Sequence, residues 1–162
     1  MKLIKLLYLA DRKALLDCGK PITGDRMVST PKGPVLIGIQ DLINWGQKRE
    51  EPCAWLEYIS PPERYEVLLV NPDPDFDLLS ERECLILDEI DAMYGKVDKW
   101  SLAELTHELP EWRDPYGSSL PIDPADILRA ESRCEQEIKH IAEDAEQALL
   151  LDKIGRLDLR PE

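Results

Sequence analysis

The sequence has few histidines and cysteines, the residues that most often bind zinc or act as nucleophile–base pairs. It contains two histidines, and its four cysteines stand 35, 31 and 50 positions apart with no Cys-x-x-Cys pair. These spacings match neither a structural zinc site nor a thioredoxin-like motif, so we expect four reduced, partly buried thiols. No serine lies in a nucleophile-elbow pattern, so a histidine-dependent triad has no sequence signature here.

Long apolar runs are also missing. Nothing approaches the roughly 20 apolar residues that span a bilayer. The apolar stretch from Leu3 to Ala10 leads directly into charged residues, with no small-residue cleavage pattern. We therefore expect a cytoplasmic protein with no signal peptide and no membrane partner.

Positive charge is scarce outside the first third of the chain. Residues 1–50 hold nine Lys and Arg against five Asp and Glu, whereas residues 51–123 hold five against eighteen, and the formal net charge is −13. An acidic body repels phosphate groups, and residues 1–50 show no Lys/Arg cluster on a recognition helix. We therefore expect no nucleic-acid partner, and the acidic middle segment favours a basic partner through electrostatic steering.

The chain does have enough apolar residues, 43% of 162, to bury a core. The patterning predicts the α+β class, a helix-rich single domain with a small antiparallel β-hairpin or sheet packed on the helices. A helix that is apolar over most of its circumference ends at Gly19 and should be central. Further helices are expected over residues 34–45, 81–93, 102–109 and 125–151, the last long enough to kink, with extended chain over 22–30 and a hairpin made by 54–59 and 64–70.

Local signals predict where these helices begin. Gly33 and Pro34 should start the second helix, because proline has its φ already fixed for a first helical position. Ser80 and Ser101 each precede a glutamate by three positions, which is the capping-box pattern. Asp123 is an acidic cap followed by proline.

Two stretches begin like metal sites and then depart from them. His107–Glu111 starts like the zinc-protease motif His-Glu-x-x-His, but a glutamate stands in place of the second histidine and a proline would break the helix. Asp73–Asp77 starts like a calcium loop, but Leu78 replaces its glycine and Cys84 its bidentate glutamate. We expect no metal, no cofactor and no catalytic residue.

Two interpretations are open for the charged residues of the first helix. Tyr8, Asp11 and Arg12 share one face of it. Because buried charges persist only when paired, they either tie the helix to the turn at Thr23 and Asp25, or line with that turn a polar groove that grips a partner.

Aromatic residues offer a second candidate surface. Trp112 and Arg113 lie in a proline-rich stretch, and these residue types dominate interface energetics. The pair is either an exposed anchor or a tryptophan folded back on the core. The other three tryptophans are expected in the core.

Three segments near the start of the chain together resemble a known family. They read KLLYLADR at 5–12, GKPITGD at 19–25 and KGPV at 32–35. In this order and spacing they resemble the Panacea domain, the SocA-like antitoxin family, and the similarity continues more loosely to about Asp126. The resemblance implies a Panacea-like domain over residues 1–126 and a C-terminal helical extension over 127–162. Family members usually carry a helix ahead of the first segment, and we expect it to be missing here.

The resemblance implies an antitoxin of a toxin–antitoxin system, bacterial or phage-encoded, that neutralises a cognate toxin encoded beside it by direct protein–protein binding. Two alternatives are open: a proteolytic adaptor that delivers the toxin to a bacterial protease, and a small metal-dependent hydrolase that uses His107 and nearby acids. The oligomeric state is also open. The residues expected to bind the partner are Tyr8, Asp11, Arg12, Thr23, Asp25, Gly33, Pro34, Trp112 and Arg113.

Overall fold

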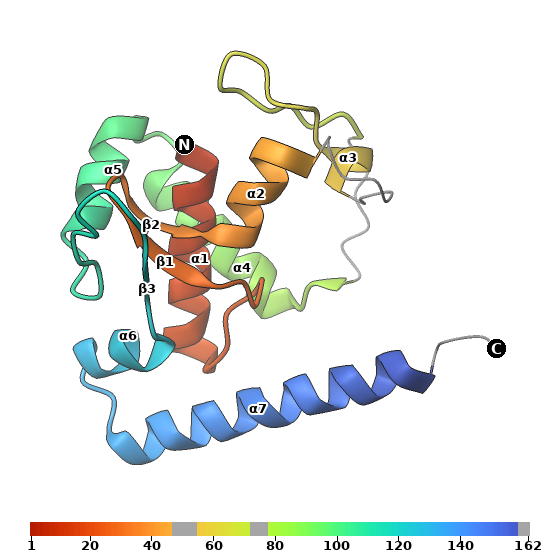
Figure 1. Cartoon of the computed structure of the whole chain (residues 1–162), viewed down its shortest axis with the longest axis vertical. Helices are drawn as coiled ribbons and strands as arrows, with labels where there is room; N and C mark the ends of the chain where they lie inside the picture. Colours follow the sequence, from red (N-terminus) through yellow and green to blue (C-terminus); the bar gives the residue numbers. More distant parts are fainter. Residues whose placement is uncertain (47–54, 72–77, 159–162) are drawn as a thin grey trace.

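The computed structural model describes residues 1–46, 55–71 and 78–158 (Figure 1). It confirms the α+β class, because helices surround one small antiparallel sheet. No helix in these ranges is long and apolar enough to cross a membrane. The elements in chain order are α1 (Lys2–Cys18), β1 (Met27–Thr30), β2 (Gly33–Leu36), α2 (Ile37–Trp45), α3 (Trp55–Tyr58), α4 (Glu81–Tyr94), α5 (Lys99–His107), β3 (Leu120–Pro121), α6 (Pro124–Ala130) and α7 (Glu135–Asp158).

The central element is α1, as its apolar circumference predicts. It contacts α4, α5, α6 and β2, which surround it in Figure 1. One side of α1 places Tyr8 and Leu15 in a core cluster with the sheet and α6, and another side places Ala10 and Ala14 in a second cluster with α4 and α5. Gly19 ends the helix in the left-handed region, with φ 75° and its amide bonded to the Leu15 carbonyl.

The sheet has the strand order β2-β1-β3, and all its pairs are antiparallel. Residues 33–36 were predicted to open a helix, and this is wrong: they form β2, with Gly33 opposite Thr30 and Leu36 opposite Met27. Helix α2 starts only at Ile37. Every residue of β2 is buried, because the strand lies against both α1 and α5, so pairing and burial outweigh the local preference of proline for a helix start.

The predicted hairpin over 54–59 and 64–70 is also corrected in part. Trp55–Tyr58 is a single helical turn instead of a strand, and residue 54 lies outside the described ranges. The two stretches do meet, since Ile59 and Leu69 form an isolated antiparallel bridge and the Val70 amide donates to the Tyr58 carbonyl at 2.8 Å. The sheet of the domain is instead formed by β1, β2 and β3, with Pro31 and Lys32 in the turn between β1 and β2.

Two of the three predicted helix caps are confirmed. Ser80 and Glu83 form the reciprocal capping box at the start of α4, and Asp123 accepts from the Ala125 amide at the start of α6. The box predicted at Ser101 is wrong. Asp98 caps α5 instead and accepts from the amides of Trp100 and Ser101, so the helix begins three residues earlier than its serine suggests.

The long C-terminal helix is interrupted, and the predicted kink is a complete break. α6 ends at Ala130, Ser132 has a φ of 63°, and α7 starts at Glu135. α7 then runs below the rest of the molecule, roughly across the direction of α1 (Figure 1). The domain boundary predicted after residue 126 falls inside α6 and stays a prediction.

Several burial predictions need correction. Trp45 and Trp100 are 55% and 63% exposed and are therefore not core residues, whereas Trp55 is half-buried. Cys18 and Cys134 are exposed and only Cys84 is partly buried, although all three are free thiols. The fourth cysteine and the calcium-like stretch at 73–77 lie outside the described residues.

Candidate partner-binding site

The first predicted site residues, Tyr8 and Arg12, converge on a carboxylate far along the chain. The Tyr8 hydroxyl and the Arg12 Nε both donate to Oε1 of Glu111 at 2.8 Å, and Arg12 Nη2 donates to the other oxygen at 3.3 Å. Arg12 also donates to Glu131 at 2.7 Å. The side chains of Tyr8 and Glu111 are fully buried, and burial, followed by the Glu111 charge, raises the pKa of Tyr8 well above its ordinary value. This pairing fastens α1 to the segment after α5.

Asp11 holds the turn that follows α1 against the helix. It is fully buried and accepts hydrogen bonds from the Thr23 amide at 3.0 Å and from the Thr23 hydroxyl. Burial raises the pKa of Asp11, against the opposing effect of the bonds from Thr23. This contact agrees with the first of the two interpretations drawn from the sequence, in which the charged residues tie α1 to the turn. Thr23 is nevertheless exposed at the surface of the protein.

Asp25 connects the same turn to α2. Its carboxylate accepts from the Ile39 amide at 2.8 Å, near the first turn of α2, where a negative charge suits the helix dipole. Gly38 makes this approach possible, because a Cβ there would lie 2.8 Å from Asp25 Oδ1.

Gly33 and Pro34 meet the first helix through Lys5. The buried Lys5 ammonium donates to the Pro34 carbonyl at 2.7 Å, and burial lowers the pKa of Lys5 to about 7. Gly33 has a φ of 93°, and a Cβ there would lie 2.6 Å from Lys5 Nζ and 2.7 Å from Thr106 Oγ1. The glycine is needed for both its backbone angle and its lack of a side chain.

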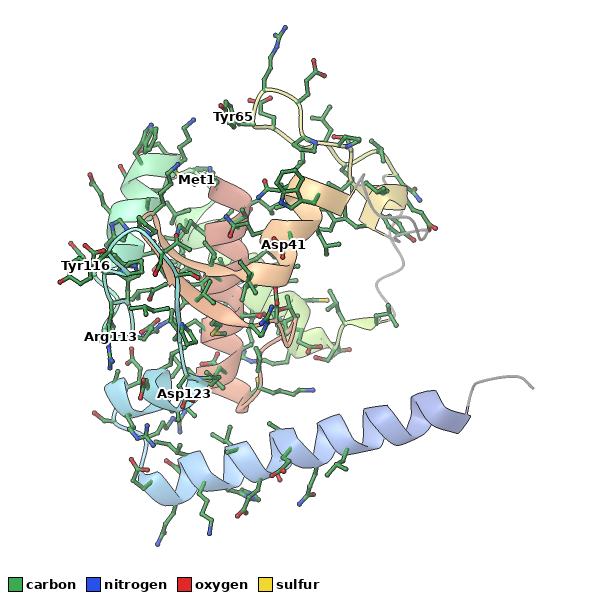
Figure 2. All side chains as sticks on the ribbon, viewed as in Figure 1. Met1, Asp41, Tyr65, Arg113, Tyr116 and Asp123 are labelled. Carbon is green, nitrogen blue, oxygen red and sulfur yellow. The ribbon has the colours of Figure 1, made fainter. Side chains whose placement is uncertain are left out.

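Trp112 is folded back against the sheet, whereas Arg113 is not. The Trp112 indole N–H donates to the Thr30 carbonyl at 3.1 Å, and its ring packs at a tilt against His107 with centroids 4.3 Å apart. The Arg113 side chain is 76% exposed and lies 4.0 Å from Asp126. Figure 2 shows Arg113 and Tyr116 extending outward from the loop between α5 and β3, and Tyr116 is 93% exposed.

The structure therefore holds two of the predicted residue sets, Tyr8 with Arg12 and Gly33 with Pro34, through partners that the sequence did not indicate. Glu111 was read only as the residue replacing a zinc ligand, and Lys5 only as part of a motif. The partly buried Arg12 requires an acidic partner, but that acid is 99 positions away and no local pattern points to it. Among the described residues no group of three or more His, Cys, Asp or Glu is arranged to hold a metal.

The three segments whose contacts have just been described lie within a single family match. The model of the SocA-like antitoxin, Panacea domain, matches residues 3–113. The chain belongs to this family. Searches of curated proteins and of solved structures gave no match. The match covers nearly all of α1, the β1–β2 hairpin, α4 and α5 together with Glu111, so most of the hydrogen-bonded network around α1 lies inside the family domain. Glu131, the second partner of Arg12, follows the match, as do α6 and α7.

Proposed function

We propose that this protein is an antitoxin that neutralises a cognate toxin by direct protein–protein contact. The observation that carries the proposal is the family match over residues 3–113. Several polar side chains of the motif segments hold α1 to its neighbours. Lys5, Tyr8 and Asp11 are at most 1% exposed, so they shape the domain and do not reach a partner directly.

The partner surface then consists of exposed residues that the hydrogen-bonded network around α1 holds in place. Arg113 is exposed beside the half-buried Trp112, in the segment that Glu111 fixes to α1. An arginine held on a rigid base loses little conformational freedom on binding, which favours it as an anchor. The net charge of −13 favours a basic toxin through electrostatic steering.

Co-expression with the product of the adjacent gene tests the proposal. Expression of that product alone should stop growth, and this chain should restore it and co-purify with the product. Arg113→Ala removes the anchor and should weaken binding about tenfold or more without changing the melting temperature. Lys96→Ala, the matched loss of a cation on an exposed residue of the α4–α5 turn, should have little effect. Failure of the wild type to rescue or to co-purify contradicts the proposal.

Direct blocking and delivery to a protease predict different lifetimes for the toxin. A blocking antitoxin leaves the half-life of the toxin unchanged or lengthens it, whereas an adaptor shortens it. A pulse-chase measurement with and without this chain distinguishes the two, and we propose the blocking mechanism.

A further inference from the structure

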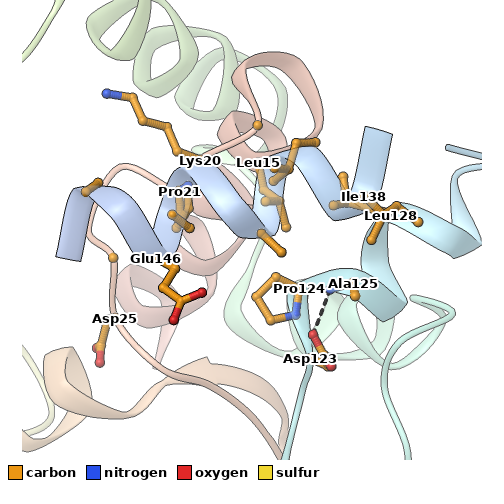
Figure 3. A pocket seen from close by; sticks show the side chains of 16 residues that line it. Leu15, Lys20, Pro21, Asp25, Asp123, Pro124, Ala125, Leu128, Ile138 and Glu146 are labelled. Atoms are coloured by element: carbon orange, nitrogen blue, oxygen red, sulfur yellow. Dashed lines mark hydrogen bonds between the residues drawn. The ribbon is translucent and has the colours of Figure 1, made fainter. Parts of the chain in front are cut away.

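A groove of about 650 Å³ runs along α7 (Figure 3). One wall is the turn that follows α1, from Gly19 to Asp25, together with the start of α6. The other wall is the inner face of α7 between Ile138 and Ala148. Most of the lining side chains are apolar, so the groove is a water-filled space beside hydrocarbon, which is unfavourable unless something else covers it.

The groove stays open because α7 changes from large to small residues along its inner face. Near its start, Ile138 is buried in the core cluster and Ile141 packs on Gly19, where a Cβ would lie 3.2 Å from the Ile141 Cγ1. Farther along, the inner face carries Ala142, Ala145 and Ala148. Methyl groups are too short to close the gap, so α7 is anchored at one end and leaves space at the other.

The rim of the groove is negatively charged. Asp25, Asp123 and Glu146 lie on it, against the single cation Lys20, whose side chain extends away from the groove in Figure 3. Glu146 makes no hydrogen bond or ion pair with any residue that the structure describes, in contrast to Glu143 and Asp144 on the same helix, which pair with residues four positions earlier. An unpaired carboxylate beside an apolar floor is suited to a cation on an apolar segment.

We propose that this groove binds a cationic amphipathic helix of the partner toxin, with its apolar face on the alanines of α7 and its Lys or Arg side chains on Asp25, Asp123 and Glu146. The identity of the partner as a toxin rests on the function proposed above. The groove between Ile138 and Ala148 is about 15 Å long, which accepts about three turns of a second helix. The alanines let the two helix backbones approach closely, as helix-in-groove recognition requires.

A synthetic peptide tests the groove without the toxin. The probe is a fluorescein-labelled peptide of about 18 residues, with leucines at intervals of three and four and lysines elsewhere, and its counterpart carries glutamates in place of the lysines. Fluorescence polarisation with the full chain should show binding of the leucine–lysine peptide and much weaker binding of the leucine–glutamate peptide. Equal binding of the two peptides, or none of either, overturns the proposal.

Matched variants locate the binding to the groove. Ala145→Trp fills it and should weaken the leucine–lysine peptide about tenfold or more, whereas Gln147→Trp, which adds the same side chain outside the groove, should change affinity less than about twofold. Glu146→Lys should weaken binding more than Glu143→Lys, which makes the same charge change off the rim. Circular dichroism confirms that each variant is folded. Equal effects within either pair overturn the proposal.

Two further measurements identify the occupant. If the adjacent-gene product binds the wild type but binds Ala145→Trp equally well, the groove is not the toxin site, and the proposed antitoxin function still stands. If the peptide results hold but that product does not bind, the antitoxin function fails and the groove still stands. Sedimentation of the wild type as a dimer and of Ala145→Trp as a monomer would show that a second copy of the chain occupies the groove, which overturns the proposal.

Discussion

Lys5 is an ammonium group buried without a carboxylate, and its removal should change how stability depends on pH. It is 1% exposed, and among the described residues its hydrogen bond goes to the Pro34 carbonyl and no acid lies within ion-pair distance. Burial lowers its pKa to about 7 from an ordinary value of 10.5. The folded protein therefore releases this proton at a lower pH than the unfolded chain does.

The sign of the effect follows from proton counting. Between pH 7 and the unfolded pKa, the unfolded chain holds more protons at Lys5, so the free energy of unfolding rises with pH. The slope approaches about 1.4 kcal/mol per pH unit, and the integrated gain between pH 7 and pH 9.5 is at most about 3 kcal/mol. Measurements should stop near pH 9.5, because the raised pKa of Tyr8 reverses the trend once the tyrosine of the unfolded chain ionises.

Lys5→Met removes the titrating group and keeps most of the side-chain volume. The variant also leaves the Pro34 carbonyl without its hydrogen-bond donor. At neutral pH the substitution therefore recovers only part of the free-energy cost of burying the Lys5 ammonium. Urea unfolding followed by tryptophan fluorescence at several pH values should show the rise in wild type and a flatter profile in the variant. The N-terminal amine also has a lowered pKa, mainly through burial and secondarily through nearby lysines that include Lys5, so most of its contribution is common to both proteins. Lys2→Met, on the same helix, serves as the control and should keep the wild-type slope; an equal slope in Lys5→Met would refute this reasoning.

Three further predictions concern the contacts around α1 and α5. Gly33→Ala forces a Cβ to within 2.6 Å of Lys5 Nζ and should lower the free energy of unfolding by about 3 kcal/mol in urea titrations, whereas Gly24→Ala, also at positive φ but with nothing within 4 Å, should cost about 1 kcal/mol. Glu111→Gln removes the buried one of the two carboxylates that pair with the partly buried Arg12 and should cost about 2 kcal/mol, and a loss below 1 kcal/mol would show that this ion pair is not needed. Asp98→Ala should lower the melting temperature more than Ser101→Ala, because the aspartate caps α5, and the reverse order would mean that the serine is the cap.

The features that could be predicted from the sequence are those set by neighbours in the chain. Gly19 as a left-handed helix end, the capping box of Ser80 and the Asp123–Pro124 start of α6 all depend on bonds spanning a few residues, and all are present. The central position of α1 also followed from its composition, because a helix without a polar face must be covered on all sides.

The features that were missed depend on contacts between distant residues. Gly33 and Pro34 have local preferences that suit a helix start, yet β2 forms there because it pairs with β1 and receives the bond from Lys5. The carboxylate of Glu111 lies 103 positions from Tyr8 along the chain, and only the folded arrangement brings the two together. The groove along α7 was missed for a similar reason: the alanine pattern of α7 is visible in the sequence, but the wall that faces it comes from the turn after α1.

The positions of the network and of the groove suggest how the two parts of the chain divide their roles. Tyr8, Arg12 and Glu111 lie inside the matched segment of 3–113 and are turned inward, so substitutions there act on folding. The groove joins the turn at Gly19–Asp25, which belongs to that segment, to α6 and α7, which follow it. A change on the inner face of α7 can therefore alter which helix fits the groove without disturbing any bond around α1. On the proposal that the groove binds the toxin, α7 contributes to selectivity for the partner alongside the anchor at Arg113, and the network around α1 stabilises the wall of the groove that faces α7.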